Sequence, residues 1–80
     1  MALKPDYSAP FRHLGDALAA KGQLNDAIAS YRKAIELKPG YAKAHYRLAI
    51  ALQRKGEREA AKREFSEAER LDPELKPPEQ

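Results

Sequence analysis

The chain has 80 residues and no cysteine, so it is one small domain that neither disulfides nor thiolate-bound metals stabilise. Its 42% hydrophobic and 34% charged residues exclude a disordered chain, and a net charge of +3 lacks the basic excess that is typical of nucleic-acid-binding domains. No apolar run approaches the ~20 residues that span a bilayer, and no apolar signal core follows Met1, so we expect a soluble, cytoplasmic protein without a membrane contact.

The first segment, residues 1–7, contains a pattern that recurs along the chain. Leu3-Lys4-Pro5-Asp6-Tyr7 returns as Leu37-Lys38-Pro39-Gly40-Tyr41, and Pro73 follows at the same interval, 34 residues on each time (39 − 5 and 73 − 39). A fixed period of this length is typical of repeat architectures. We therefore interpret residues 1–7 as the remnant of a preceding unit.

The first full unit, residues 8–41, is predicted to form helices at about 8–21 and 24–37. Each helix has an apolar stripe at helical spacing: Phe11, Leu14 and Leu18 in the first, and Ala27, Tyr31 and Ala34 in the second. Ser8 or Asp6 is expected to cap the first helix, and Gly22 stands where it must stop, because glycine adopts the left-handed conformation readily. Ala27 should let the two helices approach closely.

The second unit, residues 42–75, repeats this pattern and predicts helices at about 42–55 and 58–71. The register pairs are Leu14 with Leu48, Ala17 with Ala51, Leu18 with Leu52, Gly22 with Gly56, Ala27 with Ala61, Tyr31 with Phe65, and Ala34 with Ala68. Pro73 should end the last helix. Residues 76–80, which contain Pro77 and Pro78, are expected to form an irregular tail.

These units resemble the tetratricopeptide repeat, which has a period of ~34 residues with aromatic, Leu-Gly, alanine and proline positions at fixed intervals. The first unit carries Phe11, Leu14-Gly15, Leu18, Ala27, Tyr31, Ala34 and Pro39, and the second carries His45, Leu48-Ala49, Leu52, Ala61, Phe65, Ala68 and Pro73. Departures from the family are Phe11 and His45 for tryptophan, Leu18 and Leu52 for tyrosine, and Ala49 for glycine. The resemblance covers residues 3–75 and implies an all-α fold, a right-handed α-solenoid fragment of about four helices in antiparallel helix-turn-helix pairs.

The two ends of this array differ in character. Leu24, Ile28 and Ile35 of the first unit become Arg58, Lys62 and Glu69 in the second, so the face toward a following unit has turned polar. A polar outer face is typical of a terminal repeat, although sequence drift is the alternative reading. At the other end the first helix should expose a face that an absent unit once covered. Because two units are fewer than the about three usually needed, we expect a homo-oligomer, formed by end-to-end stacking or by exchange of a helical hairpin.

Sequence motifs for catalysis, cofactors or metals are missing. The serines lack a G-x-S-x-G context, the two histidines are not at i, i+3 or i+4 spacing, and no H-E-x-x-H occurs. We therefore expect no catalytic residue, no cofactor and no metal site. His45 stands at an aromatic, core-facing position of the repeat and is interpreted as a packing residue rather than a metal ligand.

In the family, the first helix of each unit lines a concave groove that binds peptides. Carried over to this chain, the groove residues are Arg12, His13, Asp16, Ala19 and Ala20 in the first unit, and Lys43, Tyr46, Arg47, Ile50 and Arg54 in the second. Basic residues dominate this set, which implies a protein or peptide partner with an acidic segment or a free C-terminal carboxylate. Tyr46 is the best candidate for an aromatic anchor.

Lys43 and Arg47 lie at i, i+4 spacing and match a lysine and an arginine with which family members clamp the C-terminal carboxylate of heat-shock chaperones. His13 stands at the place of one asparagine of that clamp, and the unit that should supply the other clamp residues is absent. The resemblance thus implies at most half a clamp. The alternatives are a partial anion site and two ordinary solvated residues.

Three functions compete at this point. The first is a protein-interaction module that binds a peptide in a basic groove. The second is a structural repeat fragment whose binding surface is taken by other copies of itself. The third, RNA or another anionic polymer bound through Arg12, Lys43, Arg47 and Arg54, is poorly supported, because only one groove aromatic is available to stack on a base.

Overall fold

The computed structural model describes residues 6–75, which form four helices and no strand. These are α1 (Ser8–Ala20), α2 (Leu24–Leu37), α3 (Ala42–Lys55) and α4 (Arg58–Leu71). They confirm the four expected helices, with α1 one residue shorter than expected. The expected remnant lies outside the described residues except for Asp6 and Tyr7, and the tail expected over 76–80 lies outside them entirely.

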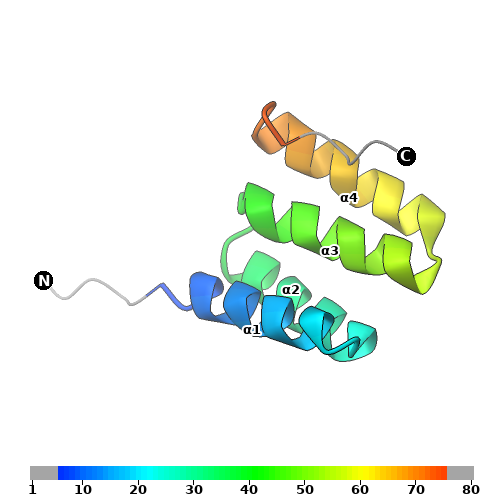
Figure 1. Cartoon of the computed structure of the whole chain (residues 1–80). Coiled ribbons are helices and arrows are strands. Elements are labelled where there is room, and N and C mark those ends of the chain that lie inside the picture. The colour runs from blue at the N-terminus through cyan, green and yellow to red at the C-terminus, as the bar shows by residue number, and fades with distance from the viewer. Residues whose placement is uncertain (1–5, 76–80) are drawn as a thin grey trace, which may run out of the picture.

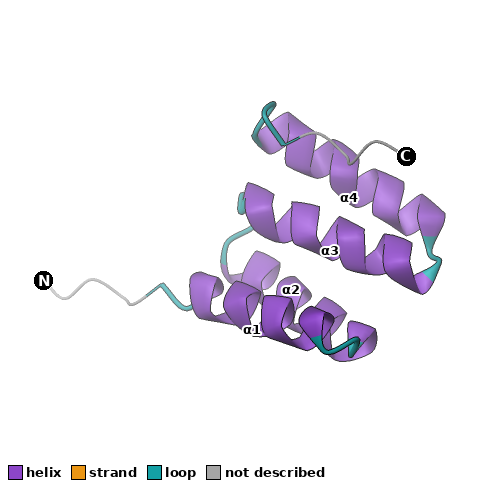
Figure 2. Ribbon diagram, viewed as in Figure 1, coloured by secondary structure: helices purple, strands orange, loops and turns teal. Residues whose placement is uncertain are grey.

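The helices stack as two antiparallel pairs in chain order (Figure 1). α1 packs mainly on α2, α2 on α3, and α3 on α4, whereas α1 and α3 touch only along a narrow contact. Short loops join consecutive helices, as Figure 2 shows. This arrangement is the expected solenoid fragment, in which α2 contacts both α1 and α3. No helix within residues 6–75 is long and apolar enough to cross a membrane.

Small side chains make the close helix contacts possible. Ala27 and Ala61 are buried, as the sequence predicts, and the larger Tyr31 and Phe65 fill the interior beside them. The remaining buried apolar residues are Ile28, Ala34, Ala44, Leu48, Ala49, Ala51, Leu52 and Ala68. Most of the core therefore lies on α2, α3 and α4.

Gly22 and Gly56 end α1 and α3 in the left-handed conformation, with φ angles of 79° and 94°. Beyond each glycine the backbone N–H of Gln23 or Glu57 donates to the carbonyl of Leu18 or Leu52, at 2.9 Å in both units. A six-residue closure of this kind satisfies carbonyl groups that the end of a helix leaves free. Both turns confirm the glycine positions expected from the sequence.

Asp6 supplies the side chain that caps α1. Its Oδ1 accepts a hydrogen bond from the backbone N–H of Ser8 at 2.8 Å and another from the Ser8 hydroxyl. Tyr7 is the residue immediately before the helix, and its side chain makes no capping hydrogen bond. The hydrogen bonds from Ser8 hold the pKa of the Asp6 carboxyl below its ordinary value. Neither candidate is the N-cap residue, which is Tyr7, but Asp6, one residue earlier, supplies the side chain that accepts from the first turn.

Equivalent positions of α1 and α3 differ sharply in burial. Leu14 is 49% exposed, whereas Leu48, its counterpart one repeat later, is 2% exposed. Ala17 is likewise exposed, and its counterpart Ala51 is buried. The difference arises because α2 covers this face of α3, while nothing within residues 6–75 covers the same face of α1. Leu14 therefore belongs to an uncovered apolar face rather than to the core.

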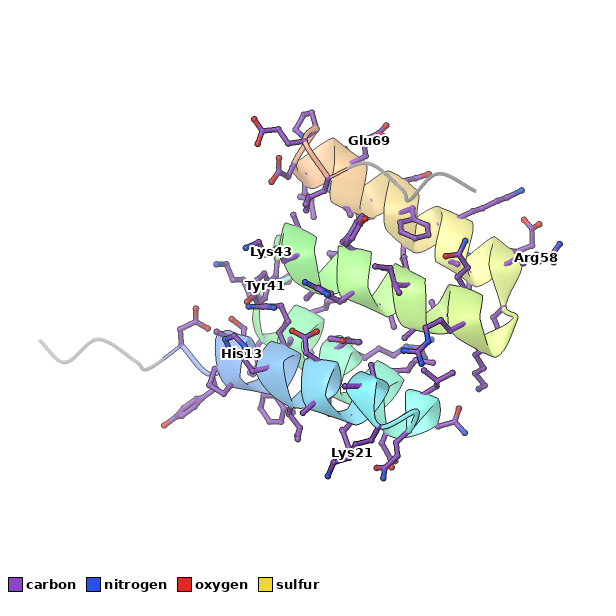
Figure 3. The ribbon with its side chains drawn as sticks, viewed as in Figure 1. His13, Lys21, Tyr41, Lys43, Arg58 and Glu69 are labelled. Atoms are coloured by element: carbon purple, nitrogen blue, oxygen red, sulfur yellow. The ribbon has the colours of Figure 1, made fainter. Side chains whose placement is uncertain are left out.

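The outer face of α4 carries charged side chains where α2 is apolar. Arg58, Lys62 and Glu69 are exposed, and Figure 3 shows Arg58 and Glu69 pointing away from the ribbon. In α2 the equivalent Ile28 is buried, while Leu24 and Ile35 are half-buried. The polar outer face expected at this end is therefore present.

We predict that Leu48→Ala destabilises the protein by about 2–5 kcal/mol, because it removes a buried side chain and leaves a cavity. Leu14→Ala, the same chemical change at the equivalent position of α1, should change the free energy of unfolding by less than about 0.5 kcal/mol. Urea unfolding monitored by circular dichroism measures both. Equal losses in the two variants would show that the face around Leu14 is covered in solution.

Candidate peptide-binding face

All ten expected groove residues lie on α1 and α3, and we call the eight of them other than Ala19 and Ala20 the α1–α3 face. It consists of Arg12, His13 and Asp16 from α1, and of Lys43, Tyr46, Arg47, Ile50 and Arg54 from α3. His13, Lys43, Arg47 and Arg54 are exposed, and the other four are half-buried. Figure 3 shows His13 and Lys43 toward the same end of the two helices, with Tyr41 at the start of α3.

Asp16 is the centre of a polar network on this face. Its Oδ1 accepts a hydrogen bond from the Tyr31 hydroxyl at 2.6 Å, and its Oδ2 accepts one from Arg12 Nη1 at 2.9 Å. The Nε of Arg47 lies 3.9 Å from Oδ1, which is an ion pair without a hydrogen bond. Asp16 therefore joins α1, α2 and α3.

Gly15 makes the contact between Tyr31 and Asp16 possible. A Cβ at this position would lie 2.6–2.9 Å from carbons of the Tyr31 ring, which is closer than van der Waals contact permits. The missing side chain lets the Tyr31 ring cross α1 and bring its hydroxyl to the neighbouring carboxylate. In the second unit the equivalent residues are Ala49, Ile50 and Phe65, and none of them can form this network.

Burial and the Asp16 carboxylate together raise the pKa of Tyr31 above its ordinary value. Burial is the largest cause of the raised pKa, because a phenolate would lose its hydration in the core. The hydrogen bond to Asp16 acts in the same direction, since it favours the neutral phenol that donates the proton. The nearby Arg47 and Arg12 oppose the shift but do not reverse it.

Arg12 makes contacts that join α1 to Tyr41, the residue immediately before α3. Its Nε donates to the Tyr41 hydroxyl at 2.7 Å, its guanidinium carbon lies 5.9 Å from the centre of the Tyr41 ring, and its side chain is only 14% exposed. The ammonium of Lys38 lies 5.0 Å from the same ring centre. Arg12 thus tethers α1 to the start of α3, and the sequence reasoning that assigned it to the groove did not foresee this role.

The basic residues of α3 are engaged to different degrees. Arg54 donates from Nη1 to the carbonyl of Ala19 at 3.1 Å, which joins the end of α3 to the last turn of α1. Arg47 is 50% exposed and held only by the long ion pair with Asp16. Lys43 is exposed one helical turn before it. Lys43 and Arg47 are therefore the cations of this face that are most accessible to a ligand.

Tyr46 and Ile50 pack against the core as well as facing outward. The Tyr46 and Phe65 rings meet edge to face, with centres 5.5 Å apart and an angle of 71°. Both Tyr46 and Ile50 are half-buried against the main apolar cluster. An edge-to-face pair of this kind is favourable, so it stabilises the observed position of the Tyr46 ring.

His45 is buried and bonded through both ring nitrogens. Its Nδ1 lies 2.7 Å from Oε1 of Glu64 on α4, and its Nε2 lies 2.9 Å from the carbonyl oxygen of Pro39. His45 thus bridges the loop before α3, α3 itself and α4. The sequence signals only an aromatic position here. Within residues 6–75 no group of three acidic, histidine or cysteine side chains is placed to hold a metal ion.

Two family models match this chain. A model described as TPR repeat matches residues 15–56, and one described as tetratricopeptide repeat matches residues 42–75. The peroxisomal targeting signal receptor of Eremothecium gossypii is 38% identical over 51 residues, which is 64% of the chain. The TPR repeat-containing thioredoxin of Arabidopsis thaliana is 40% identical over 63 residues, or 79% of the chain. The chain spans only 9% of the length of each relative.

We predict that Tyr31 ionises above the ordinary tyrosine pKa of about 10. The difference in phenolate absorbance between the wild-type protein and Tyr31→Phe isolates its titration. Because the folded pKa is raised, the stabilisation that it reflects is present below about pH 10 and is lost as pH rises through the folded pKa. Asp16→Asn should lower the pKa of Tyr31, since it removes the adjacent negative charge. Ionisation of Tyr31 at its ordinary pKa would contradict this network.

Proposed function

The chain belongs to the tetratricopeptide-repeat family, whose members are protein-interaction modules, and we propose that it binds an acidic segment or a free C-terminal carboxylate of a partner protein across the α1–α3 face. The observation that carries this proposal is the pair Lys43 and Arg47, exposed one turn apart on α3. Cations at this spacing can donate charge-assisted hydrogen bonds to one carboxylate or to neighbouring acidic groups.

The surroundings of this pair favour an anionic ligand. Arg12 and Arg54 add positive charge to the face even though their hydrogen bonds are directed within the protein. His13 lies on α1 at the repeat position equivalent to Arg47. Tyr46, held by Phe65, and the neighbouring Ile50 offer an apolar surface for side chains of the ligand.

One of the two relatives supports a role in the recognition of another protein. One of them is, by name, a receptor for a targeting signal. The proposal takes from it only this general role, that of a repeat which recognises a segment of another protein. A cytoplasmic location, expected from the sequence, remains part of the proposal. A catalytic role, a cofactor and nucleic-acid binding do not belong to it.

A second candidate function is self-association through the uncovered face of α1. The observation that favours it is the exposure of Leu14 beside exposed Pro10 and Ala17, with Tyr7 exposed at the start of the helix. End-to-end stacking would press this apolar face against the charged outer side of α4. A two-fold contact between two α1 helices avoids that mismatch and buries the same apolar patch on both copies. Exchange of a helical hairpin is the other arrangement that we consider.

We predict that a fluorescent peptide with acidic residues and a free C-terminal carboxylate binds the protein, and that Arg47→Gln weakens this binding by about five- to tenfold. The physical reason is the loss of a charge-assisted hydrogen bond at an exposed site. Fluorescence anisotropy measures the dissociation constant. Lys62→Gln, the loss of an equal charge on the outer face of α4, serves as the control and should leave affinity unchanged. Equal effects of the two variants would refute a site at Arg47.

Sedimentation velocity over a range of concentrations tests the second candidate. We expect reversible dimers, and we expect Leu14→Glu to shift the protein to monomer, because the new charge would be buried in the contact. Lys62→Glu should leave the dimer intact if two α1 faces meet, and should alter it if copies stack end to end. A wild-type protein that stays monomeric at millimolar concentration would exclude self-association.

A further inference from the structure

Asp16 is the one acidic residue of the α1–α3 face, and the second repeat forms the same helix pair without an acidic residue at the equivalent position. The equivalent residue of the second unit is Ile50, which packs against the core and carries no charge. Asp16 is half-buried, so its carboxylate still reaches the surface on which the proposed ligand would lie. A negative charge there lowers the affinity of the face for an acidic ligand. The size of this effect depends on the position of the charge relative to the accessible cations.

The contacts of Asp16 are unequal. The bonds from Tyr31 at 2.6 Å and from Arg12 at 2.9 Å fix the carboxylate, and both donors belong to buried or nearly buried side chains. The contact with Arg47 is long, 3.9 Å, and the arginine is half exposed. An ion pair of this length between partly solvated groups is weak. Asp16 therefore keeps its place, whereas the guanidinium of Arg47 can turn toward another anion.

A ligand carboxylate that binds Arg47 must replace Asp16 as its partner and remains close to the Asp16 charge. Both effects lower the affinity for an anion next to α1. Lys43 lies about 6 Å closer to the start of α3 than Arg47, since each residue of a helix rises about 1.5 Å. An anion that binds toward Lys43 is further from Asp16 and meets less repulsion.

We propose that Asp16 is a specificity-determining residue. It competes with acidic ligands for Arg47 and so directs their negative groups toward Lys43. This inference rests on the proposed peptide-binding function and deepens it. The alternative role, in which Asp16 orients Arg47 for the ligand, has the opposite consequence. Removal of the Asp16 charge strengthens binding if Asp16 competes and weakens binding if it orients.

Asp16→Asn is the direct test, because asparagine removes the charge and keeps one oxygen that can accept the hydrogen bond from Tyr31, although the amide NH2 cannot accept the second hydrogen bond, from Arg12. The acidic peptide with a free carboxylate should bind this variant about two- to fivefold more tightly, as measured by fluorescence anisotropy. Asp26→Asn makes the same change in the exposed first turn of α2 and should leave the affinity unchanged. Circular dichroism verifies that each variant is helical, and Asp16→Ser is the substitute if asparagine unfolds the protein.

The Arg47→Gln background separates competition for Arg47 from a general charge effect. Competition predicts that the gain from Asp16→Asn disappears when Arg47 is absent. A gain of the same size in both backgrounds, or an unchanged or weaker affinity of Asp16→Asn in the native background, would overturn the inference. If the peptide binds neither the wild-type protein nor any variant, the proposed function itself fails. If the peptide binds and Asp16→Asn has no effect, only the role of Asp16 fails.

Discussion

The packing of α2 between α1 and α3 is the interaction on which the rest of this structure depends. Each helix of a repeat has faces that it cannot bury alone, so a neighbour must cover them. α2 covers the inner side of α1 with Ala27 and Tyr31, and it covers α3 with Ile28. The contact between the two repeats is almost entirely that of α2 with α3, because α1 and α3 barely touch.

The same packing gives the two repeats different chemistry. In the first, Gly15 leaves space for the Tyr31 ring, and the tyrosine hydroxyl meets Asp16. In the second, Ala49 and Phe65 close the equivalent space with apolar groups. The first unit therefore presents a polar network and the second an apolar surface with two accessible cations.

Much of the fold could be predicted from the sequence, because local signals and long-range packing agree here. The period of 34 residues, the apolar stripes and the two glycines place all four helices. The candidate site could be predicted only in part. The sequence places Arg12, Arg47 and Arg54 on one side of the repeat, but it contains no signal that Arg12 bonds to Tyr41 or that Arg54 bonds to Ala19. Long side chains reach partners 29 and 35 residues away, and spacing along one helix says nothing about such contacts.

The sequence by itself determined the repeat, its helices, its family and the polar end at α4, because each depends on residue types at fixed intervals. Only the tertiary structure decided which equivalent residues are buried and which cations are accessible. Leu14 and Leu48 are the same residue at the same repeat position, yet one is exposed and the other lies in the core. The physical reason is that a residue is buried only where a neighbouring element covers it. α3 has a helix over this face, and α1 has none within residues 6–75.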